Sequence, residues 1–129
     1  MSVSQTSRDP RSPTSVLVVD DDQAFGRAIS ELLTERGYQV VGQAMTARAA
    51  LAECQELDPD AVLLDVRLPD GNGLVLAEAL CGRAGRPRVL LTSSDRQAVA
   101  RDALRQSCAT GFVPKTELPR CDLDVFLRP

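Results

Sequence analysis

Five residues with carboxylate, hydroxyl or ammonium groups follow four of the apolar runs of this sequence and could together bind and transfer a phosphoryl group. Asp20, Asp21, Asp65, Thr92 and Lys115 each stand at or just beyond the end of such a run. Carboxylate oxygens suit a hard cation such as Mg²⁺, and a carboxylate beside such an ion is a competent nucleophile toward phosphorus. The ammonium can share the charge of the transferring group, and the hydroxyl can donate to one of its oxygens.

The residue types that are missing narrow the chemistry. The chain has no His, which excludes Ser-His-Asp and Cys-His catalysis, imidazole metal sites and a phosphohistidine carrier. Lys115 is the only lysine among the 15 basic residues, so its position calls for a reason. The net charge of −3 and the 3% aromatic content argue against binding to nucleic acid or to an anionic membrane.

The elements that must position these residues alternate between strand and helix. Short apolar runs predict five strands, and amphipathic spacing predicts a helix after each. The strands are expected at 15–20, 39–44, 61–65, 88–92 and 111–113, and the helices at 23–36, 46–57, 74–83, 95–106 and 116–127. Such alternation is typical of a doubly wound α/β fold, a parallel sheet covered on both faces. Ligands of these sheets lie at the carboxyl ends of the strands, where the candidate residues fall.

Several residues have a purely structural interpretation. Asp22 and Thr46 are expected to be helix N-caps, and Asp70 to belong to the turn with Gly71. The four cysteines form no C-x-x-C pair and fall within or beside predicted helices, so we expect free thiols in a reducing cytosol.

The 129 residues suit a single domain. Residues 1–14, rich in Ser, Thr, Arg and Pro, predict a disordered tail, and residues 15–129 the folded domain. No signal peptide or membrane span is visible, which favours a cytoplasmic location.

Four motifs in order resemble the receiver domain of the response-regulator family in two-component signalling. They are VLVVDDD at 16–22, AVLLDVRLPDGNGL at 61–74, RVLLTSS at 88–94 and GFVPK at 111–115. The resemblance spans about 15–127. It implies a flavodoxin-like (β/α)5 fold with strand order 2-1-3-4-5, and a phosphoacceptor signalling domain rather than a metabolic enzyme.

The resemblance also implies a role for each matching acidic residue. Asp65 would accept the phosphoryl group. Asp21 would bind Mg²⁺ directly and Asp20 through water, with Asp65 and the backbone carbonyl of Arg67 completing the protein ligands. Arg67 and Ser94 match positions that tune dephosphorylation.

The remaining roles belong to the last two strands. Thr92 would be the switch hydroxyl, Lys115 the ammonium that binds the phosphoryl group, and Phe112 the rotating aromatic ring. The sequence departs from the family at one place: Thr116 stands where a proline usually follows the lysine, and Pro114 precedes it. This departure concerns the geometry of the loop rather than the assignment of Lys115.

The partners implied are a sensor histidine kinase or a phosphotransfer protein. Phosphorylation would alter the surface of the fourth helix, fifth strand and fifth helix and so control an output, without direct nucleic-acid or membrane contact. We expect Leu118, Leu123, Phe126 and Leu127 to pack only partly on the sheet. The apolar surface left exposed would then support a homodimer on phosphorylation.

Two alternatives stay open at this point. The spacing Asp20-x-Asp22 resembles the nucleophile motif of haloacid-dehalogenase-type phosphatases, although the chain looks short for that core and the 65–71 motif would go unexplained. The other alternative is a receiver-like binding module that is never phosphorylated. The identity of any modified aspartate separates the phosphatase from the receiver, and Mg²⁺ titration followed by beryllium fluoride separates the receiver from the binding module.

Overall fold

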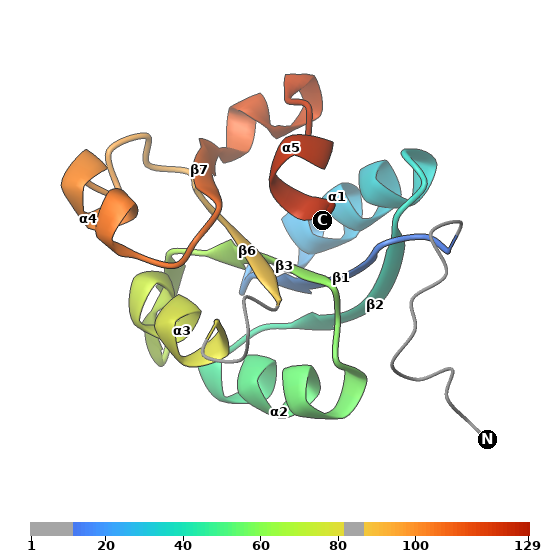
Figure 1. Cartoon of the computed structure of the whole chain (residues 1–129), viewed down its shortest axis with the longest axis horizontal. Helices are drawn as coiled ribbons and strands as arrows, with labels where there is room; N and C mark the ends of the chain where they lie inside the picture. Colours follow the sequence, from blue (N-terminus) through green and yellow to red (C-terminus); the bar gives the residue numbers. More distant parts are fainter. Residues whose placement is uncertain (1–11, 82–86) are drawn as a thin grey trace.

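A five-stranded parallel sheet forms the centre of the molecule (Figure 1). The structure, a computed structural model, describes residues 12–81 and 87–129. The sheet strands are β1 (Ser15–Val19), β2 (Gln39–Ala44), β3 (Ala61–Asp65), β6 (Arg88–Ser93) and β7 (Gly111–Pro114), in the order β2-β1-β3-β6-β7. This is the predicted order 2-1-3-4-5 of the five sheet strands, so the predicted fold is confirmed. An unpredicted two-stranded ribbon, β4 (Arg67–Leu68) and β5 (Gly71–Asn72), follows β3.

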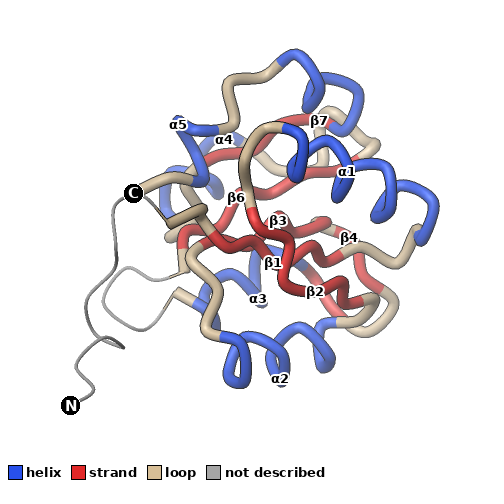
Figure 2. The backbone as a smooth tube through the Cα atoms, turned by 90° about the vertical axis from the view of Figure 1, so that its right-hand side faces the viewer, coloured by secondary structure: helices blue, strands red, loops and turns tan. Residues whose placement is uncertain are grey.

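Helices cover both faces of the sheet (Figure 2). They are α1 (Gln23–Glu35), α2 (Ala47–Leu57), α3 (Gly73–Leu80), α4 (Arg101–Gln106), the 3₁₀ helix η2 (Lys115–Arg120) and α5 (Asp124–Leu127). Alternate strand residues point to opposite faces and build two cores. Val16 and Val18 pack with α1, η2 and α5, whereas Leu17 and Val19 pack with α2 and α3.

Two helix caps agree with the prediction from the sequence, and a third was not predicted. The side chain of Asp22 accepts the N–H of Phe25 at 3.2 Å, and that of Thr46 accepts the N–H of Ala49 at 3.0 Å, so both predicted N-caps are confirmed. Asp70 does more than form a turn, because its carboxylate accepts the first two N–H groups of α2 at 2.7 and 3.1 Å. These backbone hydrogen bonds hold the pKa of Asp70 below its ordinary value.

Helix α4 is shorter than the predicted 95–106. Its first residues form turns instead, in which the Asp95 carboxylate accepts the N–H of Gln97 at 2.9 Å and the guanidinium of Arg67 at 2.9 Å. A side chain that satisfies a nearby N–H competes with the helix, and the ion pair to Arg67 holds that turn in place. The helix begins only after Ala100, which supplies no side-chain cap.

The single final helix predicted for 116–127 is also wrong. It is divided into η2 and α5, and Pro119 lies within η2, where it can supply no N–H for an α-helical bond. The division turns Leu118, Leu123 and Leu127 inward until each is at most 2% exposed. The expected partial packing of these leucines is therefore corrected, and Phe126 alone of the four stays half-buried.

The expectation of four free thiols is wrong for two cysteines. Cys81 and Cys108 form a disulfide with Cα atoms 6.2 Å apart, because the fold brings the end of α3 beside the loop after α4. Cys54 and Cys121 are free as predicted. Burial, with some contribution from the acids nearby, raises the pKa of Cys54 to about 11.

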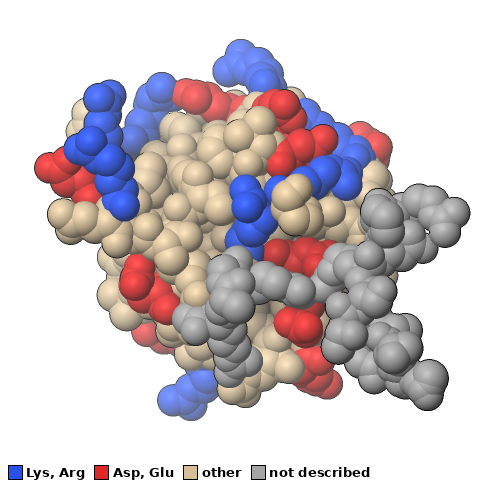
Figure 3. Space-filling view, viewed as in Figure 1, with Lys and Arg blue, Asp and Glu red and all other residues tan. Residues whose placement is uncertain are grey.

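Most of the predicted tail, residues 1–11, lies outside the described residues, as do residues 82–83 of the third predicted helix. Thr14 is buried, and its carbonyl accepts the N–H of Gln39 at 2.9 Å. Among the residues that the structure describes, none of the helices has the length and apolar character needed to cross a membrane. On the face seen in Figure 3, acidic and basic side chains are interspersed, which agrees with the small net charge.

Candidate functional site

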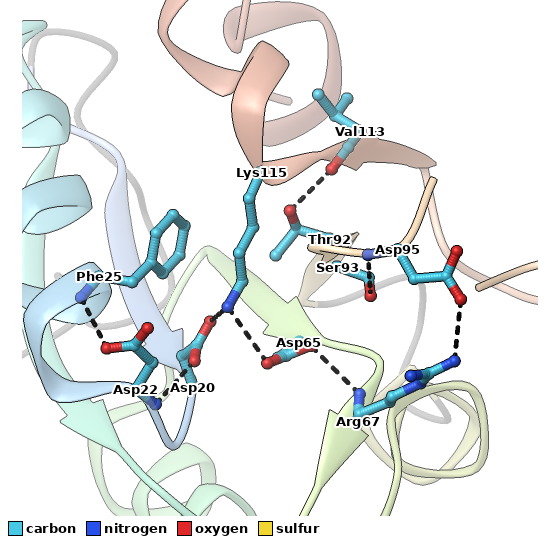
Figure 4. A network of polar contacts seen from close by, with 10 residues as sticks. All are labelled: Asp20, Asp22, Phe25, Asp65, Arg67, Thr92, Ser93, Asp95, Val113 and Lys115. Atoms are coloured by element: carbon cyan, nitrogen blue, oxygen red, sulfur yellow. Dashed lines mark hydrogen bonds and ion pairs between the residues drawn. The ribbon is translucent and has the colours of Figure 1, made fainter. Parts of the chain in front are cut away.

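Asp20, Asp65 and Lys115 meet at the carboxyl edge of the sheet (Figure 4). They follow β1, end β3 and follow β7, three strands of one parallel sheet. Nζ of Lys115 lies 2.8 Å from Oδ2 of Asp20 and 3.5 Å from Oδ2 of Asp65. The side chain of Lys115 is 15% exposed, that of Asp20 1% and that of Asp65 8%, so these charges interact in a largely desolvated pocket.

Asp21 completes an acidic cluster with Asp20 and Asp65. One carboxylate oxygen from each lies within 4.8 Å of the others, and Asp21 is the exposed member. Among the described residues, Oδ2 of Asp20 is buried and accepts no hydrogen bond of acceptable geometry, although Lys115 lies close to it. An all-oxygen donor set, in which one buried oxygen has only the Lys115 ammonium as partner, fits a hard divalent cation such as Mg²⁺.

The charges in the pocket shift one another's protonation. Burial raises the pKa of Asp65 above its ordinary value, against the backbone hydrogen bond from Arg67 and the charge of Lys115. Burial alone would lower the pKa of Lys115, but the close ion pair with Asp20 and the charge of Asp65 outweigh burial and raise it. Lys115 is therefore cationic at neutral pH.

Local contacts fix the orientation of these side chains. The N–H of Arg67 donates to Oδ1 of Asp65 at 3.1 Å, and the N–H of Asp22 donates to Oδ1 of Asp20 at 2.9 Å. Nζ of Lys115 also lies 4.3 Å from the centre of the Phe25 ring, a cation–π contact. Phe25 was not singled out from the sequence, because on α1 it reads only as an apolar core position.

Thr92 lies next to Asp65 in the sheet but its hydroxyl is directed elsewhere. The two residues are register partners on β6 and β3. Oγ1 of Thr92 donates to the carbonyl of Val113 on β7 at 2.7 Å and is buried (Figure 4). Phe112, also on β7, is half-buried against the core on the α2 and α3 side.

Arg67 spans the mouth of the site rather than pointing into it. Its guanidinium pairs with Asp95 at 2.9 Å, and the two side chains are 71% and 42% exposed. This ion pair joins the loop after Asp65 to the loop after Thr92, and the N–H of Asp95 in turn donates to Oγ of Ser93 at 3.1 Å. Sequence reasoning missed Asp95 as a partner, because only the fold brings the two loops together.

The structure therefore gathers five of the predicted site residues at one edge, namely Asp20, Asp21, Asp65, Thr92 and Lys115. Asp22 instead caps α1. The carbonyl of Arg67 as a metal ligand stays a prediction.

Comparisons with known proteins place this geometry in a family. The family model described as response regulator receiver domain matches residues 16–121. The transcriptional regulatory protein PdtaR of Mycobacterium tuberculosis is 34% identical over 76% of this chain and 49% of its own length. A protein-glutamate methylesterase/protein-glutamine glutaminase of Alkalilimnicola ehrlichii is 36% identical over 77% of this chain and 26% of its own length. The chain thus spans between a quarter and a half of these two curated relatives.

Solved structures agree. The signal receiver domain of the putative response regulator NarL from Mycobacterium tuberculosis superposes with a TM-score of 0.74 at 34% identity, covering 84% of this chain and 88% of that one. A CheY-like receiver domain from Methylobacillus flagellatus gives a TM-score of 0.71 at 26% identity, covering 81% and 87%. With the family model matched over most of its length and the acidic pocket at the expected edge of the sheet, this chain belongs to the response regulator receiver domain family of two-component systems.

Proposed function

We propose that Asp65 accepts a phosphoryl group from a sensor histidine kinase or a phosphotransfer protein, and that the domain relays this event to an output. The observation that carries the proposal is the pocket itself. Asp65 lies beside the ammonium of Lys115 and forms a cluster with the carboxylates of Asp20 and Asp21 at the carboxyl edge of the sheet. A signalling role, rather than turnover of a metabolite, accords with the receiver family.

The transfer is a displacement at phosphorus. A carboxylate oxygen of Asp65 forms an O–P bond while the P–N bond to the donor imidazole breaks, and the imidazole leaves with the bonding pair and takes up a proton from solvent. The N–H of Arg67 holds Oδ1 of Asp65 in a fixed orientation for this attack. Water later attacks phosphorus, releases phosphate and restores the carboxylate.

Positive charge is the second requirement of the transfer. Lys115 is cationic, largely buried and 3.5 Å from Asp65, so it can hold an oxygen of the incoming phosphoryl group. Asp20, Asp21, Asp65 and the carbonyl of Arg67 would hold Mg²⁺, which when bound supplies further charge to the phosphoryl oxygens.

The switch we propose is an exchange of hydrogen-bond partners at Thr92. Its hydroxyl donates to the carbonyl of Val113, and a phosphoryl dianion on the neighbouring Asp65 offers a stronger acceptor. Movement of Thr92 would free space for Phe112 to turn inward. The altered surface would then comprise α4, β7 and α5, and it would meet the output partner, in the cytoplasm.

Phosphorylation of the purified chain by acetyl phosphate with Mg²⁺ tests the proposal. Intact-mass and peptide spectrometry should find one labile phosphoryl group on Asp65, and Asp65→Asn should abolish it. Asp22→Asn is the matched control, because Asn also caps helices and Asp22 lies outside the cluster. It should be labelled like the wild type.

Three results would contradict the proposal. Label on Asp20 would favour the phosphatase alternative, and equal labelling of Asp65→Asn would remove Asp65 as acceptor. Absence of label together with absence of any response to Mg²⁺ and beryllium fluoride would favour the binding module that is never phosphorylated.

A further inference from the structure

Helix α4 is weakly held by its own packing. It has six residues, none of them fully buried, and its N-cap Ala100 makes no side-chain hydrogen bond. Leu104 and Ala103 are only half-buried, and Leu104 packs at the margin of the core. Short helices depend on tertiary contacts for their stability, so the anchors at the ends of this one matter.

The disulfide provides a covalent anchor at the carboxyl end of α4. Cys81 is the C-cap of α3, and Cys108 lies two residues beyond the last residue of α4. The N–H of Cys108 also donates to the Glu78 carboxylate on α3 at 3.1 Å. The bond therefore joins the ends of α3 and α4, which pack against the same core.

The site suits both redox forms of the cysteines. Cys108 is exposed and Cys81 half-buried, so a thiol in solution can reach the bond, and exposed disulfides are the labile ones. In the disulfide-bonded structure, a carbonyl that could accept from the reduced thiol already lies near each sulfur. The carbonyl of Ala77 lies 3.2 Å from Sγ of Cys108, and that of Cys108 lies 3.6 Å from Sγ of Cys81.

From these contacts we propose that Cys81 and Cys108 form a thiol–disulfide switch that locks α4 against α3 when oxidised and releases it when reduced. The oxidant is a disulfide of the glutathione class. The Cys108 thiolate attacks it, one glutathione thiolate leaves, and Cys81 then displaces the second from the mixed disulfide. Two protein thiols are oxidised, one small disulfide is reduced to two thiols, and an excess of thiol drives the reverse.

The lock acts on a segment that runs between two parts of the site. Residues 93–110 connect Thr92 to β7, whose Val113 carbonyl accepts the Thr92 hydroxyl. Where this inference touches signalling it rests on the proposed function: an oxidised bond would restrain the α4 surface that phosphorylation is proposed to alter. The lock itself needs no phosphoryl group.

Hydrogen exchange on the whole unphosphorylated chain, equilibrated in glutathione buffers of different ratio, tests the lock. Peptide mapping after alkylation should show the Cys81–Cys108 bond in the oxidised buffer and four thiols in the reduced one. The amides of 101–107 should exchange at least about tenfold more slowly in the oxidised protein. Cys121→Ser, the matched control, should keep that difference, and Cys108→Ser should lose it.

The main comparison is between the oxidised and reduced forms of the wild-type protein, so the test remains valid even if Cys108→Ser folds poorly. A bond that forms in none of the buffers would overturn the proposal, and so would a bond that leaves exchange of 101–107 unchanged. Asp65→Asn should show the same redox difference as the wild type. Failure of the switch is thereby separated from failure of the phosphoacceptor.

Discussion

At the scale of single residues, the site depends on one ammonium placed among three carboxylates. Lys115 contacts Asp20 and Asp65 and lies over Phe25, in a slot that leaves its side chain 15% exposed. Carboxylates so close together repel one another unless cations offset their charge. Lys115 offsets part of it, and the exposed Asp21 leaves the outer side of the cluster open to a metal ion.

Mg²⁺ should therefore stabilise the fold through Asp21. At a Mg²⁺ concentration ten times its Kd, mass action contributes about 1.4 kcal/mol, which thermal melts detect as a rise in Tm. Asp21→Asn should lose most of that rise, whereas Asp22→Asn should retain it. A wild type whose Tm is unchanged by millimolar Mg²⁺ would contradict the metal site.

Replacement of the lysine by arginine should uncouple binding from switching. The ammonium is a compact point charge, whereas the planar guanidinium is larger and cannot take the same position over Phe25 and between the two carboxylates without local rearrangement. We expect Lys115→Arg to keep the fold and the Mg²⁺-dependent rise in Tm. It should lose the change in amide hydrogen exchange that beryllium fluoride causes in β7 and α4 of the wild type.

The opposite substitution, Arg96→Lys, serves as a control, because Arg96 is exposed and pairs with Glu117 at the surface. It should respond like the wild type. A full response from Lys115→Arg would reduce Lys115 to a general source of charge.

At the scale of elements, close packing between α3 and the end of β3 sets the position of Asp65. A Cβ on Gly73 would lie 2.6 Å from the carbonyl oxygen of Asp65 and 2.8 Å from Cα of Val66, both backbone atoms. The N–H of Gly73 donates to the carbonyl of Val66 at the same junction. Only glycine lets α3 begin so close to the strand that carries the proposed acceptor.

Gly73→Ala should consequently displace α3 and misplace Asp65. We expect a loss of stability of about 1–3 kcal/mol in urea unfolding, together with slower labelling by acetyl phosphate. Gly71→Ala is the matched control, since its Cβ would meet only Cβ of Ala47 at an ordinary 3.5 Å. Equal stability of the two variants would show that the junction can relax.

A second contact between elements ties the connection between α1 and β2 to α5. Oδ1 of Asp124 accepts hydrogen bonds from the Tyr38 hydroxyl and from Nε of Arg128, the latter at 2.6 Å. Both bonds lower the pKa of Asp124 below its ordinary value of 3.8, and the Tyr38 hydroxyl contributes more. A carboxyl with a depressed folded-state pKa stabilises the fold above its unfolded pKa, and this contribution is lost as pH falls through the folded-state value.

Asp124→Asn should therefore cost stability at pH 7 and cost progressively less below about pH 4. The side chain is exposed, so we expect a difference of about 1 kcal/mol or less, measured by urea unfolding across this range. Tyr38→Phe removes one donor and should give a smaller version of the same pH dependence. If the difference in unfolding free energy between the wild type and Asp124→Asn did not change with pH, the depressed pKa of Asp124 would be contradicted.

At the scale of the whole molecule, the sheet separates two cores and brings the site to one edge. Leu118, Leu123 and Leu127 are buried in the core shared with α1, so they leave no apolar face for a partner. Val125 is the large apolar side chain that stays exposed on α5, at 63%. A homodimer on phosphorylation then depends on changes in α4, β7 and α5 rather than on apolar surface already present.

Sedimentation with and without beryllium fluoride measures this directly. If the α4, β7 and α5 surface forms the homodimer, the fluoride complex with Mg²⁺ should sediment as a dimer, and Val125→Asp should weaken it. An unchanged monomer at high concentration would exclude the homodimer, and a contact mapped to α1 and α2 would contradict the choice of surface.

The sequence by itself determined the alternation of strands and helices and the edge at which the acidic residues, Thr92 and Lys115 would meet. Periodicity reports local structure, and the carboxyl ends of parallel strands share one edge, so residues that end apolar runs can be assigned to one site. The same reasoning accounts for the caps at Asp22 and Thr46, because each contact spans only three residues.

Only the tertiary structure decided which distant groups touch. The Thr92 hydroxyl donates to Val113, Arg67 pairs with Asp95, Asp70 caps α2, and Cys81 is bonded to Cys108, all across separations of 21–28 residues. Each contact depends on how one loop or helix docks beside another, and local pattern carries no information about that docking. Helix α4 is shorter than predicted because the long-range ion pair between Asp95 and Arg67 outweighs the helical periodicity there. The final helix is divided because Pro119 supplies no N–H for an α-helical bond.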